Sequence, residues 1–400
     1  MDDTRDCVIA GGGPAGLMAG FLLARAGLRV TVLERHPDFL RDFRGDTIHP
    51  STLQLMSELG FLDEFLTLPH QKAHALHAEI AGRQVTIADF SALPLQTRYI
   101  AFMPQWDFLN FIAAKAQALP GFRLCMGAQV LDLIHEGGKV AGLRWQDGQG
   151  ARHDSRAALV IGADGRHSVV RQKAGLQVRD FGSAVDVVWF RLTRLPEDPA
   201  PAMSHAGPQQ GLVLIDRGDF WQCGYVIRKG SYDDLKAGGL PAFRQALAAL
   251  APLPSGRFDE IESWEQVHLL SIRMDRLVRW WAPGVLCIGD AAHAMSPVGG
   301  FGVNLAVQDA VAAARILAGP LRRGRLTGRD LARVQARRMF PTRATQGLQR
   351  MMRRKRNAQG QAAPRPPGFI RAIARMPALS RLMGRLIGMG FRMEKIGDGR

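Results

Sequence analysis

The chain has only four cysteines among 400 residues, and they are scattered at Cys7, Cys125, Cys223 and Cys287. None of the spacings is that of a metal-ligand set, so the sequence predicts no metal site. Cys7 and Cys287 lie inside apolar runs that are typical of strands. We therefore expect buried free thiols in a reducing compartment rather than disulfides.

Long apolar runs are also missing. No stretch reaches the roughly 18 apolar residues that a membrane-spanning helix needs. The N-terminus begins with acids and enters an apolar strand at once, so no signal peptide is visible. The sequence therefore predicts a cytoplasmic globular protein, and its length suggests two or three domains with an ample core.

Acidic residues are outnumbered, with 36 Asp and Glu against 52 Lys and Arg, which gives a formal net charge of +16. The excess lies at the C-terminus: residues 321–400 hold 21 Lys and Arg and three acids, a charge of +18, so residues 1–320 carry −2. This pattern predicts a near-neutral body with a basic tail. Nucleic-acid binding is a remote alternative, because aromatic residues are poorly interleaved with the basic ones and no reader motif is present.

What the sequence does contain is a glycine-rich unit from Cys7 to Arg35, with an apolar strand, a turn, a helical run and a second strand. Gly11 permits the tight turn, Gly13 lets a phosphate approach the backbone, and Gly16 lets the helix pack close to the sheet. Glu34 ends the second strand, where a carboxylate can accept hydrogen bonds from both hydroxyls of an adenosine ribose. The unit predicts a dinucleotide site; a glycine-rich turn of another α/β protein would leave Glu34 unexplained.

Two further motifs follow strands in the same way. The run Leu159–Arg171 contains a strand that ends in Gly162-Ala163-Asp164-Gly165, and the run Leu286–Asp309 contains one that ends in Gly289-Asp290. The latter continues through Pro297, Gly299, Gly300, Gly302 and Asn304 into a helix. A carboxylate at a strand end and a glycine-rich helix start suit a polyol chain and an electron-rich heterocycle.

The ordered set of three motifs, over roughly residues 5–345, resembles the flavoprotein monooxygenases of the para-hydroxybenzoate hydroxylase fold, also called class A aromatic hydroxylases. This chain is similar to their short, single-component type. The resemblance implies an α/β fold, α+β overall, with a Rossmann-like FAD-binding domain interleaved with a β-sheet substrate domain and a C-terminal helical tail. The expected boundaries are 1–74, 99–178 and 275–345 for the FAD-binding domain, 75–98 and 179–274 for the substrate domain, and 346–400 for the basic helical region.

The resemblance also assigns roles to residues. Glu34 would hold the adenosine ribose, and Arg44 and Gln105 the phosphates and linker of FAD. Asp164 and Gly165 would serve FAD and the incoming nicotinamide, Asp290 would hold the ribityl chain, and Gly299–Asn304 would line the isoalloxazine edge. The predicted FAD-binding residues are Gly11, Gly13, Pro14, Ala15, Gly16, Glu34, Arg35, Arg44, Gln105, Val130, Asp164, Gly165, Asp290, Pro297, Gly299, Gly300, Phe301, Gly302 and Asn304.

The activity that the resemblance implies is a monooxygenation. NAD(P)H would reduce FAD, O2 would form a flavin C4a-hydroperoxide, and an aromatic or polycyclic small molecule would be hydroxylated. The sequence identifies no catalytic base; His49 is a weak candidate, and His293 is interpreted as structural. A related reductase of isoprenoid chains and a non-enzymatic FAD-fold escort protein remain alternatives. Halogenation is disfavoured, because Phe220–Tyr225 lacks the W-x-W-x-I-P element of the halogenases of this fold.

A second sheet is expected from Asp180–Arg194, Gly211–Arg228 and Glu262–Met274, with a helix at Ala242–Leu250. It would form the ceiling of the substrate site, and its period-two pattern does not say which side chains face the flavin. The available large side chains are Trp189, Phe190, Met203, Trp221 and Trp264. Because only one complete dinucleotide unit is present, NAD(P)H is expected to bind transiently near Asp164, Arg166 and Gln105.

The tail should be helical with breaks at Pro341, Pro364–Gly368 and Pro377. We interpret it as a cap packed on the FAD-binding domain, because its glycines and prolines suit short segments better than one interfacial helix. Peripheral membrane contact is the less favoured alternative. A homodimer is left open.

Overall fold

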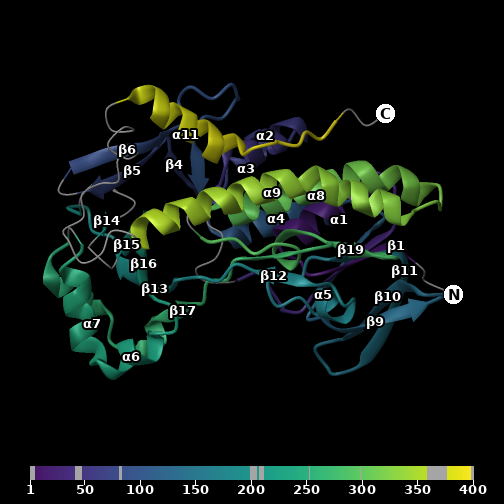
Figure 1. Cartoon of the computed structure of the whole chain (residues 1–400), viewed down its shortest axis with the longest axis horizontal. Helices are drawn as coiled ribbons and strands as arrows, with labels where there is room; N and C mark the ends of the chain where they lie inside the picture. The colour runs from purple at the N-terminus through teal and green to yellow at the C-terminus, as the bar shows by residue number, and fades with distance from the viewer. Residues whose placement is uncertain are drawn as a thin grey trace.

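The computed structural model describes residues 5–40, 47–80, 83–198, 205–206, 211–251, 253–297, 299–357 and 376–397. Two large sheets lie at opposite ends of an elongated molecule, and two long helices run between them along its length (Figure 1). The predicted α/β fold with an interleaved second sheet and a C-terminal helix is confirmed. Its division into domains by residue range stays a prediction.

The first sheet carries the three motifs. Its eight strands are β1 (Arg5–Ala10), β2 (Val30–Glu34), β8 (Phe122–Met126), β9 (Gln129–Glu136), β10 (Lys139–Gln146), β11 (Arg152–Gly162), β19 (Trp281–Ala282) and β20 (Val285–Cys287). The spatial order is β19-β20-β11-β1-β2-β8, with β9 and β10 attached through β11. The pairs β8–β2, β2–β1, β1–β11 and β11–β20 are parallel.

The register explains why distant motifs meet. Ala10, the last residue of β1, is opposite Leu33 of β2 and Gly162 of β11. Gly162 is in turn opposite Cys287, the last residue of β20. The carboxyl ends of four parallel strands therefore share one edge, which is where ligands bind in open α/β sheets.

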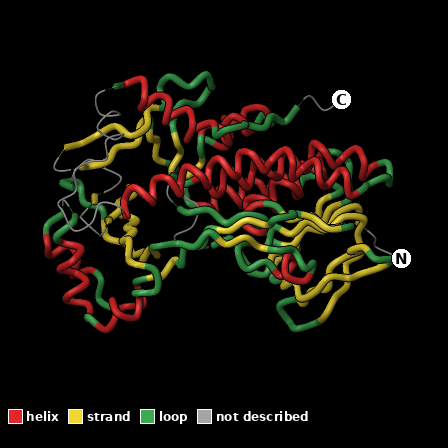
Figure 2. Tube along the Cα trace, viewed as in Figure 1, coloured by secondary structure: helices red, strands yellow, loops and turns green. Residues whose placement is uncertain are grey.

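Helices cover one face of this sheet (Figure 2). The helix α8 packs against α1 and α9, and α4 packs against α1; their bounds are α1 (Pro14–Arg25), α4 (Gln105–Gln117), α8 (Phe301–Arg322) and α9 (Gly328–Asn357). The length and composition of α8 would let it span a membrane, but 83% of its most apolar window is buried inside the protein. It is the core helix of this layer.

The second sheet has seven strands in the order β17-β13-β16-β15-β14-β5-β6. They are β5 (Ala75–Ile80), β6 (Arg83–Asp89), β13 (Val185–Thr193), β14 (His205–Ala206), β15 (Gly211–Asp216), β16 (Phe220–Arg228) and β17 (His268–Leu270). The elements α6 (Tyr232–Ala237), α7 (Gly239–Ala248) and η1 (Ser255–Glu260) stand beside it, and α7 and η1 contribute to the core on one of its faces.

Two strand predictions in this sheet were wrong. The run Gly211–Arg228 is two strands, because the chain turns at Gly218, which has a φ of 92° that suits glycine. The run Glu262–Met274 contains η2 (Trp264–Gln266), capped by Ser263, and only three residues of strand in β17.

Small elements connect the two sheets. A ribbon of β12 (Val178–Asp180) and β18 (Asp275–Leu277) lies where the chain leaves for the second sheet and returns from it. A three-stranded sheet contains β3 (Thr47–Ile48), β7 (Ile100–Phe102) and β4 (Gln71–Ala73). The remaining helices of the N-terminal half are α2 (Pro50–Glu58), α3 (Leu62–Phe65) and α5 (Val169–Lys173), and η3 (Gly289–Ala291) follows β20.

The C-terminal region corrects two expectations. Pro341 does not end a helix but lies inside α9. The last described helix, α11 (Pro377–Met389), packs against β6 of the second sheet as well as against α2, whereas the sequence interpretation placed it on the FAD-binding domain alone. Gly384 permits this packing, since a Cβ there would overlap the Asp89 carbonyl group. The predicted break at Pro364–Gly368 lies outside the described residues.

Candidate active site

The glycine turn is built as the sequence predicted. Gly11 has a φ of 98°, and its N–H donates to the Leu33 carbonyl at 2.8 Å. A Cβ on Gly11 would overlap Ala163, and one on Gly16 would overlap the carbonyl group of Gly11. Both glycines are therefore needed for the close approach of α1 to two strands.

The start of α1 is open. A Cβ on Gly13, the N-cap residue, would meet no atom within 4 Å. No side chain caps the helix and no acid lies in its first turn, which begins with Pro14 and Ala15. The amide groups of this turn therefore present an uncompensated positive dipole end, which suits a phosphate.

Glu34 lies directly beside this turn and is 9% exposed. Its Oε2 accepts the Gly12 N–H at 2.8 Å, and its Oε1 accepts the His36 N–H at 3.0 Å. The two backbone bonds fix the carboxylate where the resemblance places the adenosine ribose.

Asp164 shapes its own loop. Its carboxylate accepts the Ser168 hydroxyl at 2.5 Å and the Val170 N–H at 3.1 Å, at the start of α5. Burial raises the pKa of this carboxyl group. The next residue, Gly165, has a φ of 80°, so the Asp-Gly pair forms a turn that few other residue pairs would adopt.

The third motif lies against the first two. A Cβ on Gly289 would come within 2.9 Å of the Ala15 Cβ, so this glycine brings η3 onto the first turn of α1. Asp290, 30% exposed, pairs with Arg166 at 3.3 Å. Arg166 was expected near the nicotinamide, and its ion pair joins the Asp-Gly loop to the Gly-Asp loop.

The start of α8 is a second glycine-rich turn. Gly299 and Gly300 have φ values of 82° and 62°, and the Gly300 N–H donates to the Pro297 carbonyl at 3.0 Å. The helix has no side-chain cap and no acid in its first turn, where Phe301 is buried and Gly302 is half-buried. The amide groups of this turn therefore present a second uncompensated positive dipole end.

Asn304 holds that loop in place. Its Oδ1 accepts the His49 N–H at 2.9 Å and the Thr52 hydroxyl at 2.7 Å, and its Nδ2 donates to the Thr47 and Gly300 carbonyls, both at 3.1 Å. All four hydrogen-bonding positions of the amide are occupied. Asn304 therefore positions the loop, and its side chain has no polar group left for a cofactor.

His49 is in a poor position for a catalytic base. It is 1% exposed, its Nδ1 donates to the Ile387 carbonyl at 2.9 Å, and burial lowers its pKa to about 4. The cavity that it borders has a volume of about 20 Å³, too small for an aromatic substrate. A neutral, weakly basic imidazole in such a space suits packing against Phe301 better than proton abstraction.

Of the other predicted residues, Gln105 begins α4 and is half-buried, Val130 is a buried residue of β9, and Arg35 is exposed. Arg44 lies outside the described residues.

The sequence reasoning missed a buried ion network, which we define as His293, Asp309, Arg337, Arg338 and Glu394. Asp309 accepts from the Gly289 N–H at 3.1 Å, from His293 at 2.6 Å and from Arg338 at 2.8 Å. Burial alone would raise the pKa of Asp309, but the charges of His293 and Arg338 hold it below its usual value. The network anchors the Gly-Asp loop from behind.

The C-terminal segment joins this network. Glu394 is 1% exposed and accepts from Arg337 at 2.7 Å and from Arg338 at 3.4 Å. The signal in the sequence that could have indicated this network was a charged residue, Asp309, inside a largely apolar helical run.

The structure separates the two faces of the second sheet. Phe190, Trp221 and Trp264 pack in the cluster that includes residues of α7 and η1. Trp189 lies on the opposite face with Val187 and Ile272, and its ring covers Gly224, where a Cβ would come within 2.9 Å. Ile215 touches both this cluster and the one that contains Phe301. The Trp189 face is therefore the one turned toward the start of α8; Met203 lies outside the described residues.

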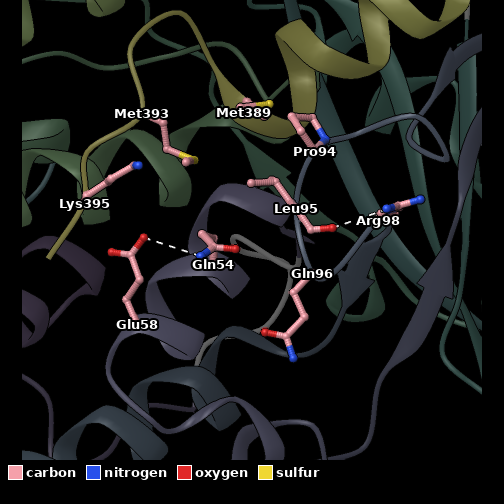
Figure 3. A pocket seen from close by; sticks show the side chains of 9 residues that line it. All are labelled: Gln54, Glu58, Pro94, Leu95, Gln96, Arg98, Met389, Met393 and Lys395. Atoms are coloured by element: carbon pink, nitrogen blue, oxygen red, sulfur yellow. Dashed lines mark hydrogen bonds between the residues drawn. The ribbon is translucent and has the colours of Figure 1, made fainter.

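A hollow of about 600 Å³ lies elsewhere, between α2, the segment 94–98 and the C-terminal segment (Figure 3). It is lined by Gln54, Glu58, Pro94, Leu95, Gln96, Arg98, Met389, Met393 and Lys395. Since none of the predicted FAD-binding residues lines it, it is distinct from the site described above.

Comparison with known proteins gives one family match and many relatives. The model of the FAD binding domain family matches residues 4–346. The 6-methylpretetramide 4-monooxygenase of Streptomyces rimosus is 33% identical over 95% of this chain and 91% of its own length. The rifampicin monooxygenase of Streptomyces venezuelae is 30% identical over 76% of this chain, which spans 62% of that protein.

Solved structures share the fold. The OxyS anhydrotetracycline hydroxylase from Streptomyces rimosus superposes with a TM-score of 0.76 at 23% identity, covering 99% of this chain and 78% of that one. This likeness extends through the second sheet and the C-terminal helices.

Proposed function

Since this chain belongs to the FAD binding domain family, we propose that it is an FAD-dependent monooxygenase that hydroxylates a polycyclic aromatic molecule with NAD(P)H and O2. The two relatives at 30% identity or more carry monooxygenase names. Their names refer to polycyclic natural products, which supports that substrate class over a simple phenol.

The observation that carries the proposal is the meeting of three motifs at one sheet edge. The open start of α1, the fixed Glu34 carboxylate and the partly exposed Asp290 lie along this edge. They match the diphosphate, ribose and ribityl groups of FAD in charge and in hydrogen-bonding character. The residues present therefore fit FAD.

When bound, FAD supplies the redox and oxygen chemistry. The chain's own residues bind and orient it. The uncapped start of α8 favours negative charge on the electron-rich ring, and Asn304 fixes the loop that presents this helix end. The Trp189 face of the second sheet supplies an apolar surface that excludes water from the reacting groups.

NAD(P)H has no dinucleotide fold of its own in this proposal. We place it in the groove at Asp164, Arg166 and Gln105. Burial lowers the pKa of His167, and the charges of the nearby arginines, Arg166 among them, lower it further. This positive surrounding supports an anionic ligand there.

The decisive experiment measures oxygen incorporation. The purified protein should be yellow with about one FAD per chain, and a panel of polycyclic phenols and polyketides should stimulate NAD(P)H oxidation. Product formed under ¹⁸O2 should contain one heavy oxygen atom. A reduced product without heavy oxygen would favour the related reductases, and a chain that takes up no FAD would end the proposal.

The role of Asp290 has its own test. Replacing it with alanine should weaken FAD binding or flavin turnover while the fold survives, because a lost acceptor to a polyol hydroxyl is worth about 1–3 kcal/mol. Glu34→Ala should also weaken FAD binding, since it removes the carboxylate that lies beside the start of α1. Fluorescence titration of the apo protein with FAD measures both, and unchanged affinity and turnover for Asp290→Ala would contradict the assignment.

A further inference from the structure

Four arginines gather on the side of the β12–β18 ribbon that faces α9, and we call them the arginine cluster: Arg179, Arg276, Arg343 and Arg350. Three of them surround one aromatic ring. The guanidinium carbon of Arg179 lies 5.6 Å from the centroid of the Phe181 ring, and those of Arg276 and Arg350 lie 5.1 Å from it. The fourth, Arg343, lies on α9 and is exposed.

The cluster has no carboxylate of its own among the described residues. No Asp or Glu oxygen there comes within 4.0 Å of these guanidinium nitrogens, and Arg276 instead donates to the Gln346 side-chain oxygen at 2.7 Å. Of the two acids adjacent in sequence, Asp180 accepts the Gly182 N–H at 2.7 Å and Asp275 pairs with Arg171 at 3.4 Å. No Asp or Glu occurs at all between Asp330 and Glu394.

The electrostatics of the cluster are unfavourable without a partner. Arg276 is 8% exposed, and burial together with the charges of Arg343, Arg179 and Arg350 lowers its pKa. Cation–π contacts with Phe181 offset part of the repulsion, at about 0.5–1 kcal/mol each for exposed groups. Like charges held together in this way attract a multiply charged anion, because its attraction to each guanidinium group offsets their mutual repulsion.

The surface above the cluster is open. Arg343, Gly347 and Arg350 follow the spacing i, i+4, i+7 and so share one side of α9. Gly347 is exposed, and a Cβ on it would meet no atom within 4 Å, so packing does not require glycine there. A glycine inside a helix costs about 0.5–1 kcal/mol relative to alanine. Gly347 therefore leaves a surface without a side chain between Arg343 and Arg350, which we call the shelf, and an anion can approach the helix there.

The geometry points to a binding site for a phosphate or diphosphate group at the arginine cluster. Guanidinium groups bind phosphate oxygens through paired N–H donors, and three of them gather around one aromatic ring here. The site is separate from the groove at Arg166, because Asp275 of the same ribbon faces Arg171 near the Asp-Gly loop, whereas its neighbour Arg276 faces α9.

The test uses the FAD-loaded protein, so that the start of α1 is filled, and inorganic pyrophosphate as the probe. Calorimetry should detect binding that weakens as salt rises. Arg343→Gln and Arg350→Gln should each weaken it at least tenfold. Arg333→Gln is the matched control, because it removes an equal charge from α9 at a position that pairs with Asp330; its affinity should stay within twofold of the wild type.

Two sources of the phosphate group give different kinetics. If the ligand is a phosphate of an NADPH molecule that extends from the groove at Arg166 to the cluster, as the proposed function would allow, both cluster variants will raise the KM for NADPH at least fivefold with kcat unchanged. If it is a separate phosphorylated molecule, they will lose pyrophosphate binding with the KM for NADPH unchanged. FAD content, read by absorbance, reports on the proposed function independently of either result.

Three results would overturn the inference. The wild type could fail to bind pyrophosphate, the two cluster variants could bind it as tightly as the wild type does, or Arg333→Gln could lose as much affinity as the cluster variants lose. Binding to anionic vesicles that requires Arg343 and Arg350, without pyrophosphate binding, would assign this face to a membrane surface instead.

Discussion

Helix α9 carries arginines into two opposite environments. Arg337 and Arg338 reach the buried carboxylates of Glu394 and Asp309. Further along the same helix, Arg350 lies by the Phe181 ring and the charge of Arg343 acts on Arg276, with no described carboxylate within 4.0 Å of either guanidinium group. The same side chain therefore stabilises the fold where acids face it and creates a positive surface where none does.

The two regions also differ in what they connect. The buried ion network joins the C-terminal segment to the Gly-Asp loop, because Asp309 contacts both Arg338 and the Gly289 N–H. The arginine cluster joins α9 to the ribbon between the sheets. We expect substitutions in the first region to change the free energy of unfolding, and substitutions in the second to change anion binding.

The largest expected effect is that of Glu394→Gln. This substitution leaves Arg337 without a carboxylate and Arg338 with Asp309 alone, and breaking buried pairs in this way costs about 4–5 kcal/mol. Urea unfolding at pH 7 measures the loss. Lys395→Gln, an exposed change of one charge in the next residue, should be nearly neutral, and equal effects of the two variants would show that the network does not anchor the segment.

The position of Glu394 explains what sequence reasoning could not reach. The three glycine motifs were predictable, because each is local and parallel strands bring their carboxyl ends to one edge. Glu394 pairs with Arg337 and Arg338, which lie 57 and 56 residues away in the sequence, and no local pattern predicts such a pairing. The sequence likewise did not say which side chains of the second sheet share a face, and the packing shows that Trp189 and Trp221 lie on opposite faces.

Local context also changed the interpretation of two residues, Pro341 and Asp164. Pro341 was expected to break a helix, yet α9 continues through it, held on both sides by packing against α8 and by residues such as Arg338 and Gln346. Asp164 was predicted from resemblance as a cofactor residue, and its bonds to Ser168 and Val170 show a turn-forming role that the spacing Asp-x-x-x-Ser could have suggested.

Asp309→Asn should have the next largest effect, about 3–4 kcal/mol at pH 7, because it leaves Arg338 with one buried carboxylate instead of two. The folded-state pKa of Asp309 is depressed, so its contribution is present above the pKa of the unfolded chain and is lost as the pH falls through the folded value. Unfolding free energies of the wild type and the variant should therefore converge toward acid pH. A difference that stays constant between pH 7 and pH 3 would contradict an ionised Asp309.

A matched pair on α9 sharpens the comparison. Arg337→Gln removes two hydrogen bonds to Glu394, and bonds to charged groups are worth about 1.5–3 kcal/mol. Arg343→Gln removes an exposed charge that repels its neighbours, so stability should change by no more than about 0.5 kcal/mol. Both are read by urea unfolding; an equal loss in Arg343→Gln would mean that the cluster, too, has a structural partner.

A change smaller than the losses in the buried ion network is expected when the cluster is supplied with the acid that it lacks. In Gly347→Glu the new carboxylate stands between Arg343 and Arg350 at helical spacings, where each favourable pair is worth about 0.2–0.5 kcal/mol. Loss of glycine adds up to about 1 kcal/mol, because nothing occupies the Cβ position. Gly347→Ala gives the second gain without the first, so the two variants should both be more stable than the wild type by a similar, small amount.

The two variants should differ in binding: Gly347→Glu should lose pyrophosphate, because its carboxylate occupies the shelf and neutralises the two arginines, whereas Gly347→Ala should retain it. If both variants bound pyrophosphate equally, the shelf at Gly347 would have no part in anion recognition, and the contrast between the two arginine environments of α9 would be one of charge alone.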